Sequence, residues 1–125
     1  DVYKRQVLTH AIMDAILGAL SESDIGKLFP DTDPKYKGIY SIELLDKVVE
    51  LMDKKNYKIG NLDTVIICEM PKINPKREEI RKLIASHLNT DIDNVSIKAS
   101  TSEGLGFTGD GMGIEARAVV ILEEK

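Results

Sequence analysis

Hydrophobic side chains recur at helical spacing in three stretches of the chain. The first covers residues 7–20, the second residues 41–55 and the third residues 74–88. In each, apolar positions three or four residues apart line one face, which is typical of an amphipathic helix packed on a core. The predicted core positions are Leu8, Ile12, Ala15, Ile16 and Ala19 in the first, Ile42, Leu45, Val48, Val49 and Met52 in the second, and Ile80, Leu83, Ile84 and Leu88 in the third.

The starts of the second and third helices carry typical capping residues. Ser41 is a predicted N-cap, and Asn74 followed by Pro75 is a good N-cap and first-turn pair. The Lys, Arg and Glu residues between the core positions of the third helix are predicted to form a solvated face.

Three other segments have the pattern of β-strands. Residues 64–68, TVIIC, form a continuous apolar run, which indicates a strand buried on both faces. A turn at residues 57–60 is expected to lead into it. Residues 95–100 alternate between apolar and polar side chains, and residues 115–122 form a last strand that closes the sheet. These elements predict a single α/β (α+β) domain.

Composition limits the classes of partner. The chain has 125 residues, of which 42% are hydrophobic and 30% charged, as expected for one soluble globular domain. Its net charge of -4 argues against a nucleic-acid partner, and no apolar run approaches the length of a membrane span. The single cysteine, Cys68, excludes an internal disulfide and fits a reducing compartment, so we predict a cytoplasmic protein.

His10 and Asp14 lie one helical turn apart, on a different face from the apolar stripe. An imidazole beside a carboxylate suits a metal site, where the carboxylate orients the ring or lies just outside the direct ligands of the ion. The plainer alternative is a surface pair that supports only the helix. A metal site needs three or four ligands, and this helix offers one or two.

Short acids gather in the loop after the first helix. Residues 24–26 (DIG) and 29–33 (FPDTD) place three carboxylates, a proline and an aromatic ring in ten residues. Such a loop suits ribose hydroxyls or metal-bound waters. The alternative is that the aspartates only stabilise the loop by bonding to nearby backbone amides.

The predicted strand at 95–100 leads into hydroxyl and carboxylate side chains. Residues 100–103 read Ser-Thr-Ser-Glu, which suits contact with phosphate and a divalent cation. Five of the nine glycines follow within residues 104–113. A glycine-rich loop can bring backbone amides close to phosphate, although any tight loop also uses glycine.

Four segments in order resemble one enzyme family. They are HAIMDAILGA from His10, DIGKLFPDTD from Asp24, MPKI from Met70 and KASTSEGLGFTG from Lys98. Together they are similar to the 2-C-methyl-D-erythritol 2,4-cyclodiphosphate synthase family of the non-mevalonate isoprenoid pathway. The resemblance implies a mixed β-sheet with helices packed on one face, and a homotrimer with active sites at the subunit interfaces.

The resemblance also implies a reaction and a set of binding residues. A phosphorus-oxygen lyase would convert 4-diphosphocytidyl-2-C-methyl-D-erythritol 2-phosphate to 2-C-methyl-D-erythritol 2,4-cyclodiphosphate and release CMP. Thr101 matches the residue that stabilises the transition state. The implied substrate-binding residues are Asp24, Ile25, Gly26, Phe29, Pro30, Asp31, Thr32 and Asp33 on the methylerythritol side, Cys68, Glu69, Met70, Pro71, Lys72, Ile73, Asn74, Ser100, Thr101, Ser102 and Glu103 on the cytidine and diphosphate side, and Phe107 and Asp110.

Two divalent metals are implied by the same resemblance. His10 corresponds to one ligand of a zinc held by an Asp-His-His set, and Glu103 would hold magnesium or manganese near the diphosphate. The other two zinc ligands belong to family segments that have no counterpart at residues 1–6, DVYKRQ. We expect residues 1–6 to be a foreign segment and residues 7–125 to be the synthase domain without its N-terminal strands, with little activity and weak zinc affinity.

A second departure lies in the glycine-rich loop, where Asp110 and Met112 replace an Arg and a Glu that are common in the family. An aspartate repels the phosphate that an arginine would accept, so the resemblance carries no anion site to this position. The alternatives to an active synthase are an inactive CMP-binding or other nucleotide-binding remnant of the same family, and an unrelated trimeric or dimeric α/β interaction domain.

Overall fold

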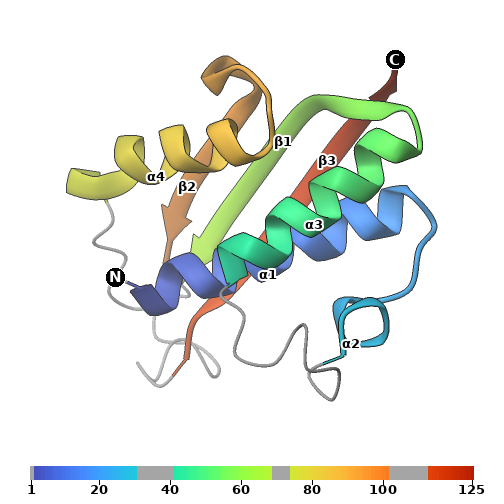
Figure 1. The fold of residues 1–125 in the computed structure, drawn as a ribbon. Helices are drawn as coiled ribbons and strands as arrows, with labels where there is room; N and C mark the ends of the chain where they lie inside the picture. Colours follow the sequence, from blue (N-terminus) through green and yellow to red (C-terminus); the bar gives the residue numbers. More distant parts are fainter. Residues whose placement is uncertain (1, 31–40, 69–73, 102–112) are drawn as a thin grey trace.

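The structure is a computed structural model that describes residues 2–30, 41–68, 74–101 and 113–125. Its elements, in chain order, are α1 (Val2–Ala19), α2 (Ile25–Leu28), α3 (Ser41–Lys54), β1 (Tyr57–Ile67), α4 (Asn74–His87), the 3-10 turn η1 (Ile92–Asn94), β2 (Val95–Ser100) and β3 (Glu115–Glu124). Figure 1 shows α1, α3 and α4 on one face of the sheet. The predicted α/β (α+β) domain, with a mixed sheet and helices on one face, is confirmed.

Among the described strands, β1 is central and lies between β2 and β3. It runs parallel to β2, with Leu62 opposite Val95 and Ile67 opposite Ser100. It runs antiparallel to β3, with Ile67 opposite Glu115. Parallel neighbours need a crossover, and here α4 follows β1 in the chain and packs on β2. The carboxyl ends of β1 and β2 therefore finish at the same edge of the sheet.

β1 starts earlier than predicted and is covered on one side only. The turn expected at residues 57–60 is strand, because Asn56, in the left-handed conformation with φ 69°, already reverses the chain after α3. Along β1, buried and more exposed side chains alternate, so the prediction that residues 64–68 are buried on both faces is wrong. The buried positions are Leu62, Thr64 and Ile66, and the more exposed ones are Asp63, Val65 and Ile67.

α1 begins before residue 7, the predicted start, and ends at Ala19 because Ser21 takes the left-handed conformation with φ 58°. The helix contacts both the sheet and α3, so it buries a wider arc than the predicted stripe. Of the predicted core positions, Ala19 is exposed and Ala15 only partly buried. The buried hydrophobic side chains of α1 are Leu8, Ile12, Met13, Ile16 and Leu17.

The other long helices and strands follow the sequence pattern closely. α3 and α4 end at Lys54 and His87, each one residue before the predicted end. β2 has the predicted bounds, and β3 continues to Glu124 instead of residue 122. The core side chains from these helices are Leu45, Val48, Val49, Met52, Ile84 and Ala85, with Ile42 and Ile80 packed at its margin.

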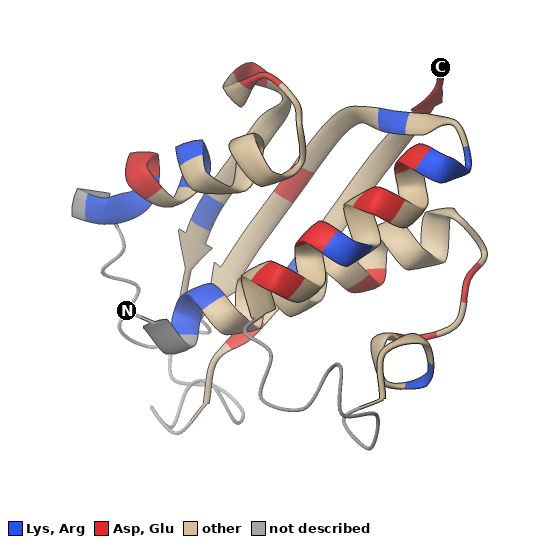
Figure 2. Cartoon of the chain, in the orientation of Figure 1, with Lys and Arg blue, Asp and Glu red and all other residues tan. Residues whose placement is uncertain are grey.

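The two outer surfaces of the domain differ. Figure 2 shows bands of both charges along α3, whose outward residues Glu43, Asp46, Lys47, Glu50, Asp53 and Lys54 are exposed. The far side of the sheet carries no helix in the described part of the chain. We call it the open sheet face and define it by the outward residues Asp63, Val65, Ile67, Lys98, Glu115, Arg117, Val119 and Ile121. No helix within the described ranges is both long and apolar enough to cross a membrane.

Replacing Leu62 with alanine tests whether the helix-covered face of β1 forms the core. Leu62 is 0% exposed. We expect Leu62→Ala to lower the free energy of unfolding by about 2–5 kcal/mol, because the cavity it leaves is only partly refilled. Urea unfolding followed by circular dichroism measures the change. Glu79→Ala, at an exposed position of α4, is the control and should change the value by less than about 0.5 kcal/mol. Equal effects of the two variants would contradict the placement of the core.

Candidate functional site

The carboxyl ends of β1 and β2 bring two predicted binding segments together. The backbone amide of Cys68, just after β1, donates to the carbonyl of Ser100 at the end of β2, with 3.1 Å between nitrogen and oxygen. Ligands of open α/β sheets commonly bind outside the carboxyl ends of parallel strands. The start of the predicted cytidine segment and the start of the predicted diphosphate segment are therefore neighbours within one chain.

The side chains at this edge have different exposure. Cys68 is only 3% exposed, so its thiol faces the core and its backbone is the part that lies at the strand end. Ser100 and Thr101 are exposed, and the hydroxyl of Ser100 donates to the carbonyl of Thr101 at 3.2 Å. The chemistry available here is that of hydroxyl and backbone groups, which suit phosphate and base edges.

The segment predicted as an acidic loop begins with a short helix, α2. Asp24 is its N-cap, and its carboxylate accepts a hydrogen bond from the backbone amide of Lys27 at 2.8 Å. The capping alternative is therefore the one that the structure gives to Asp24. Ile25 is partly buried against the core and Gly26 is exposed.

Phe29 and Pro30, which follow α2, are partly buried. Phe29 packs against the hydrophobic core and borders a cavity of about 310 Å³ between α2 and α3. The other residues that line this cavity are Leu28, Lys47, Glu50, Leu51 and Lys54. Phe29 thus has a structural role, and the cavity beside it has an apolar floor and a charged rim.

His10 and Asp14 are both exposed on α1, outside its core-facing arc, as predicted. Within the ranges that the structure describes, no group of three His, Cys, Asp or Glu side chains is placed to hold a metal. His10 is thus one donor without further ligands from this part of the chain. The described residues alone do not fit the implied zinc centre.

The described members of the two groups of predicted binding residues lie apart in one chain. Figure 1 shows α2 at the opposite side of the helix layer from β2. The backbone of Asn74 begins α4. The remaining predicted residues lie outside the described ranges, and they are Asp31, Thr32, Asp33, Glu69, Met70, Pro71, Lys72, Ile73, Ser102, Glu103, Phe107 and Asp110.

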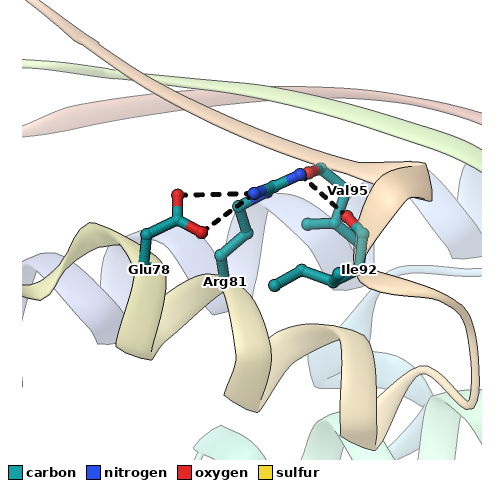
Figure 3. Close-up of polar contacts among 4 residues, drawn as sticks. All are labelled: Glu78, Arg81, Ile92 and Val95. Atoms are coloured by element: carbon teal, nitrogen blue, oxygen red, sulfur yellow. Dashed lines mark hydrogen bonds and ion pairs between the residues drawn. The ribbon is translucent and has the colours of Figure 1, made fainter.

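Sequence reasoning missed a polar contact between α4 and β2. Arg81, assigned to the solvated face of α4, is only 25% exposed, so that assignment is wrong for this residue. Its Nε donates to the carbonyl of Val95 at 2.6 Å and its Nη2 to the carbonyl of Ile92 at 3.0 Å. Figure 3 shows the guanidinium between these carbonyls and the Glu78 carboxylate. Nothing in the sequence distinguishes Arg81 from its charged neighbours.

A larger cavity, of about 510 Å³, lies elsewhere, between α3, the end of α4 and the start of β1. At its margin the Nδ1 atom of His87 is 2.6 Å from Oδ1 of Asp46, which links α4 to α3. The lining residues, Asp46, Val49, Glu50, Asp53, Lys58, Ser86, His87, Leu88, Asn89 and Lys125, include none of the predicted substrate or metal ligands.

A comparison with family models decides the relationship that the motifs suggested. The YgbB family matches residues 5–123, which is most of the chain. The chain belongs to the YgbB family. The resemblance based on the four motifs is therefore confirmed.

Curated relatives of this YgbB protein carry the synthase name. The 2-C-methyl-D-erythritol 2,4-cyclodiphosphate synthase of Clostridium perfringens is 55% identical over 116 residues, which cover 93% of this chain and 74% of the relative. The synthase of Clostridioides difficile is 56% identical over 116 residues, which cover 93% of this chain and 72% of the relative.

Solved structures of YgbB relatives have the same fold. The CDP complex of Plasmodium falciparum IspF matches with a TM-score of 0.83 and 40% identity, over 95% of this chain and 71% of that one. The bifunctional IspDF of Campylobacter jejuni matches with a TM-score of 0.88 and 35% identity, over 95% of this chain and 32% of that one.

Two substitutions of Asp24 test its helix-capping role in this YgbB chain. Serine keeps an acceptor at the N-cap, whereas alanine removes it at a cost of about 1 kcal/mol of local stability, which is roughly a fivefold change in an opening equilibrium. We expect Asp24→Ala to accelerate hydrogen exchange of the Lys27 amide by that factor and Asp24→Ser to leave it near the wild-type rate. NMR-detected exchange measures both. Equal exchange rates in the two variants would contradict the capping role.

Proposed function

We propose that this chain converts 4-diphosphocytidyl-2-C-methyl-D-erythritol 2-phosphate to 2-C-methyl-D-erythritol 2,4-cyclodiphosphate and releases CMP. It is then a phosphorus-oxygen lyase of non-mevalonate isoprenoid biosynthesis. The observation that carries the proposal is the meeting of Cys68 and Ser100 at one sheet edge, in a chain 55% identical to a synthase of that name. The relative from Plasmodium falciparum, which has the same fold, binds CDP.

The reaction is an intramolecular transfer of a phosphoryl group. An oxygen of the 2-phosphate attacks the β phosphorus, the bond from that phosphorus to the oxygen bridging the α phosphorus breaks, and CMP leaves with the electron pair. Because nucleophile and electrophile belong to one molecule, the protein must fold the substrate and stabilise the charge that develops. Residues 68–74 would hold the cytidine, and residues 24–33 would hold the methylerythritol.

The hydroxyl of Thr101 is the proposed donor to the oxygens of the transferring phosphoryl group. It lies one residue beyond β2, where Ser100 is fixed by the amide of Cys68. A donor that directly follows a paired strand needs little reorganisation as charge develops, which is the condition for electrostatic stabilisation of a transition state. Ser100 and Ser102 would complete a hydroxyl-rich surface for the diphosphate.

A divalent metal is part of the proposal. His10 is the proposed zinc ligand on α1, and Glu103 is proposed to hold magnesium or manganese. A bound divalent ion supplies positive charge that neutralises the diphosphate. Since the described residues offer His10 without two further ligands, the roles assigned above concern only substrate binding, orientation and hydrogen bonding by the protein.

We also propose a homotrimer in which each active site uses two subunits. Residues 24–30 and the end of β2 lie apart in one chain, so a site that needs both requires a second chain. The open sheet face supports this, because Val119 and Ile121 are 69% and 61% exposed there. Large apolar side chains clustered on one face commonly mark an interface.

Replacing Thr101 with valine removes the proposed donor while keeping the shape of the side chain. We expect kcat to fall about 100-fold with KM changed by less than about 3-fold, because the lost bond forms mainly in the transition state. Phosphorus NMR of substrate, cyclic product and CMP measures the rate.

Ser86→Ala, which removes an exposed hydroxyl on α4, is the matched control and should keep the wild-type rate. A thermal shift with CMP separates the two family functions, since a ligand that binds the folded state raises Tm. A Tm increase without turnover would identify the nucleotide-binding remnant. If the chain shows no CMP binding and no turnover, the synthase function and the nucleotide-binding function are both contradicted.

A charge on the open sheet face tests the proposed assembly. Val119 pairs with Asp63 across β3 and β1, so Val119→Asp places two carboxylates side by side on a face proposed to be buried between subunits. We expect the species seen by sedimentation velocity at micromolar concentration to change from a trimer to a monomer. Lys82→Gln changes the net charge by the same amount on the outer face of α4 and should keep the sedimentation coefficient of the wild-type trimer. A trimer that persists in Val119→Asp would contradict this interface.

A further inference from the structure

In the described part of the chain, the first residue of β2 bonds at its outer edge to an arginine side chain. Within the described sheet β2 is an edge strand, with β1 as its neighbour. The carbonyls of Ser96 and Ser100 face β1, because they accept from the Thr64 hydroxyl at 2.9 Å and from the Cys68 amide at 3.1 Å. Carbonyl direction alternates along a strand, so that of Val95 points to the outer edge. There it accepts from Arg81.

Arg81 bonds to the first residue of η1 as well as to the first residue of β2. Its Nη2 donates to Ile92 at 3.0 Å and its Nε to Val95 at 2.6 Å. The planar guanidinium spans both carbonyls at once, which a single ammonium cannot do with the same geometry. On its third side Nη1 is 3.0 Å from the Glu78 carboxylate, which is 58% exposed and so contributes a weaker, screened contact.

The contact lies at the end of β2 that is remote from the proposed nucleotide site. From Asn74, the last proposed cytidine-binding residue, α4 runs to Arg81 over about 10 Å at 1.5 Å per residue. From Val95, β2 returns to Ser100 over about 16 Å at roughly 3.3 Å per residue. The Arg81 contact, shown in Figure 3, thus joins α4 to the start of β2. The other ends of these two elements, Asn74 and Ser100, each belong to one half of the proposed site.

We propose that Arg81 is a positioning residue that sets the spacing between the cytidine half and the diphosphate half of the nucleotide site. It touches no substrate itself. Its role is to fix the axial position of β2 against α4, so that Ser100 and Thr101 stand at the distance that a cytidine diphosphate spans. This inference rests on the proposed function, because the two halves are assigned by it.

The test compares ligands that differ by one phosphate. CDP reaches further toward Ser100 and Thr101 than CMP, so an error in the spacing weakens CDP more. For Arg81→Gln in the full chain we expect the Kd of CDP to rise about 10-fold and that of CMP about 2-fold, since small misplacements are costly for groups that must engage together. Arg81→Lys should fall between Arg81→Gln and the wild type. Titration calorimetry measures both constants.

Two control variants isolate the carbonyl contacts. Glu78→Gln removes the exposed ion pair but keeps both carbonyl bonds, and Lys82→Gln removes a neighbouring exposed charge. Both should keep the wild-type ratio of the two dissociation constants. Thermal unfolding shows which variants fold. If Arg81→Gln does not fold, the ratio of the two dissociation constants in Arg81→Lys tests the inference instead.

The outcomes are distinguishable. An unchanged ratio in folded Arg81 variants, even with a lower Tm or with both affinities reduced equally, would show that Arg81 only stabilises the fold and would overturn the inference. If the wild-type chain binds neither nucleotide, the proposed function fails first and the positioning role falls with it. A ratio of the CDP Kd to the CMP Kd that rises in Arg81→Gln and not in Glu78→Gln supports the inference.

Discussion

Parallel pairing of β1 with β2 determines where chemistry can take place in this protein. Two adjacent strands that run the same way must be joined by a crossover, and α4 is that crossover. The pairing also aligns the carboxyl ends, so that Ile67 lies opposite Ser100 and the next amide, that of Cys68, bonds to Ser100. Inside the pair, the hydroxyl of Thr64, which is 1% exposed, donates to Ser96 and satisfies a polar group that would otherwise be buried without a partner.

The one-sided packing of the sheet follows from the positions of the helices. α1 and α3 pack on each other and against the strands, and the buried face of β1 supplies Leu62 and Ile66 to the same core. The opposite face combines the exposed Val119 and Ile121 with the ion pair between Lys98 and Asp63, whose charged atoms are 2.7 Å apart. A face with both apolar side chains and fixed charges suits a specific partner surface, because the apolar groups favour burial and the charges set the register.

Periodic segments could be predicted from the sequence and local exceptions could not. The bounds of β2 and the ends of α3 and α4 follow from regular spacing of apolar residues, which one buried face imposes. β1 starts at Tyr57, earlier than expected, because its first pairs depend on the distant β3, where Tyr57 lies opposite Glu124. α2 was missed because four residues are too few for a period, although Asp24 carries the capping signal.

The candidate site shows the same division. Its residues could be named because their motifs resemble a family, but the juxtaposition of Cys68 with Ser100 depends on strand register, which neither motif encodes. Arg81 gave no signal, since its neighbours on α4 are also charged and its partners are backbone carbonyls that any sequence provides. Contacts from a side chain to the backbone are therefore the least predictable part of this site.

The separation of the two proposed half-sites follows from the topology. α2 follows α1 and contacts it, whereas Figure 1 shows β2 across the helix layer from α2. In the described part of the chain, α1 is held between these regions by its contacts with β3 and α3, which bury Leu8, Ile12 and Ile16. Under the proposed function, the parallel pairing of β1 with β2 builds the nucleotide half-site. The same pairing also fixes the distance of that half-site from the one that follows α1. A second subunit is then the physical means of completing the site, and the apolar part of the open sheet face gives that association a driving force.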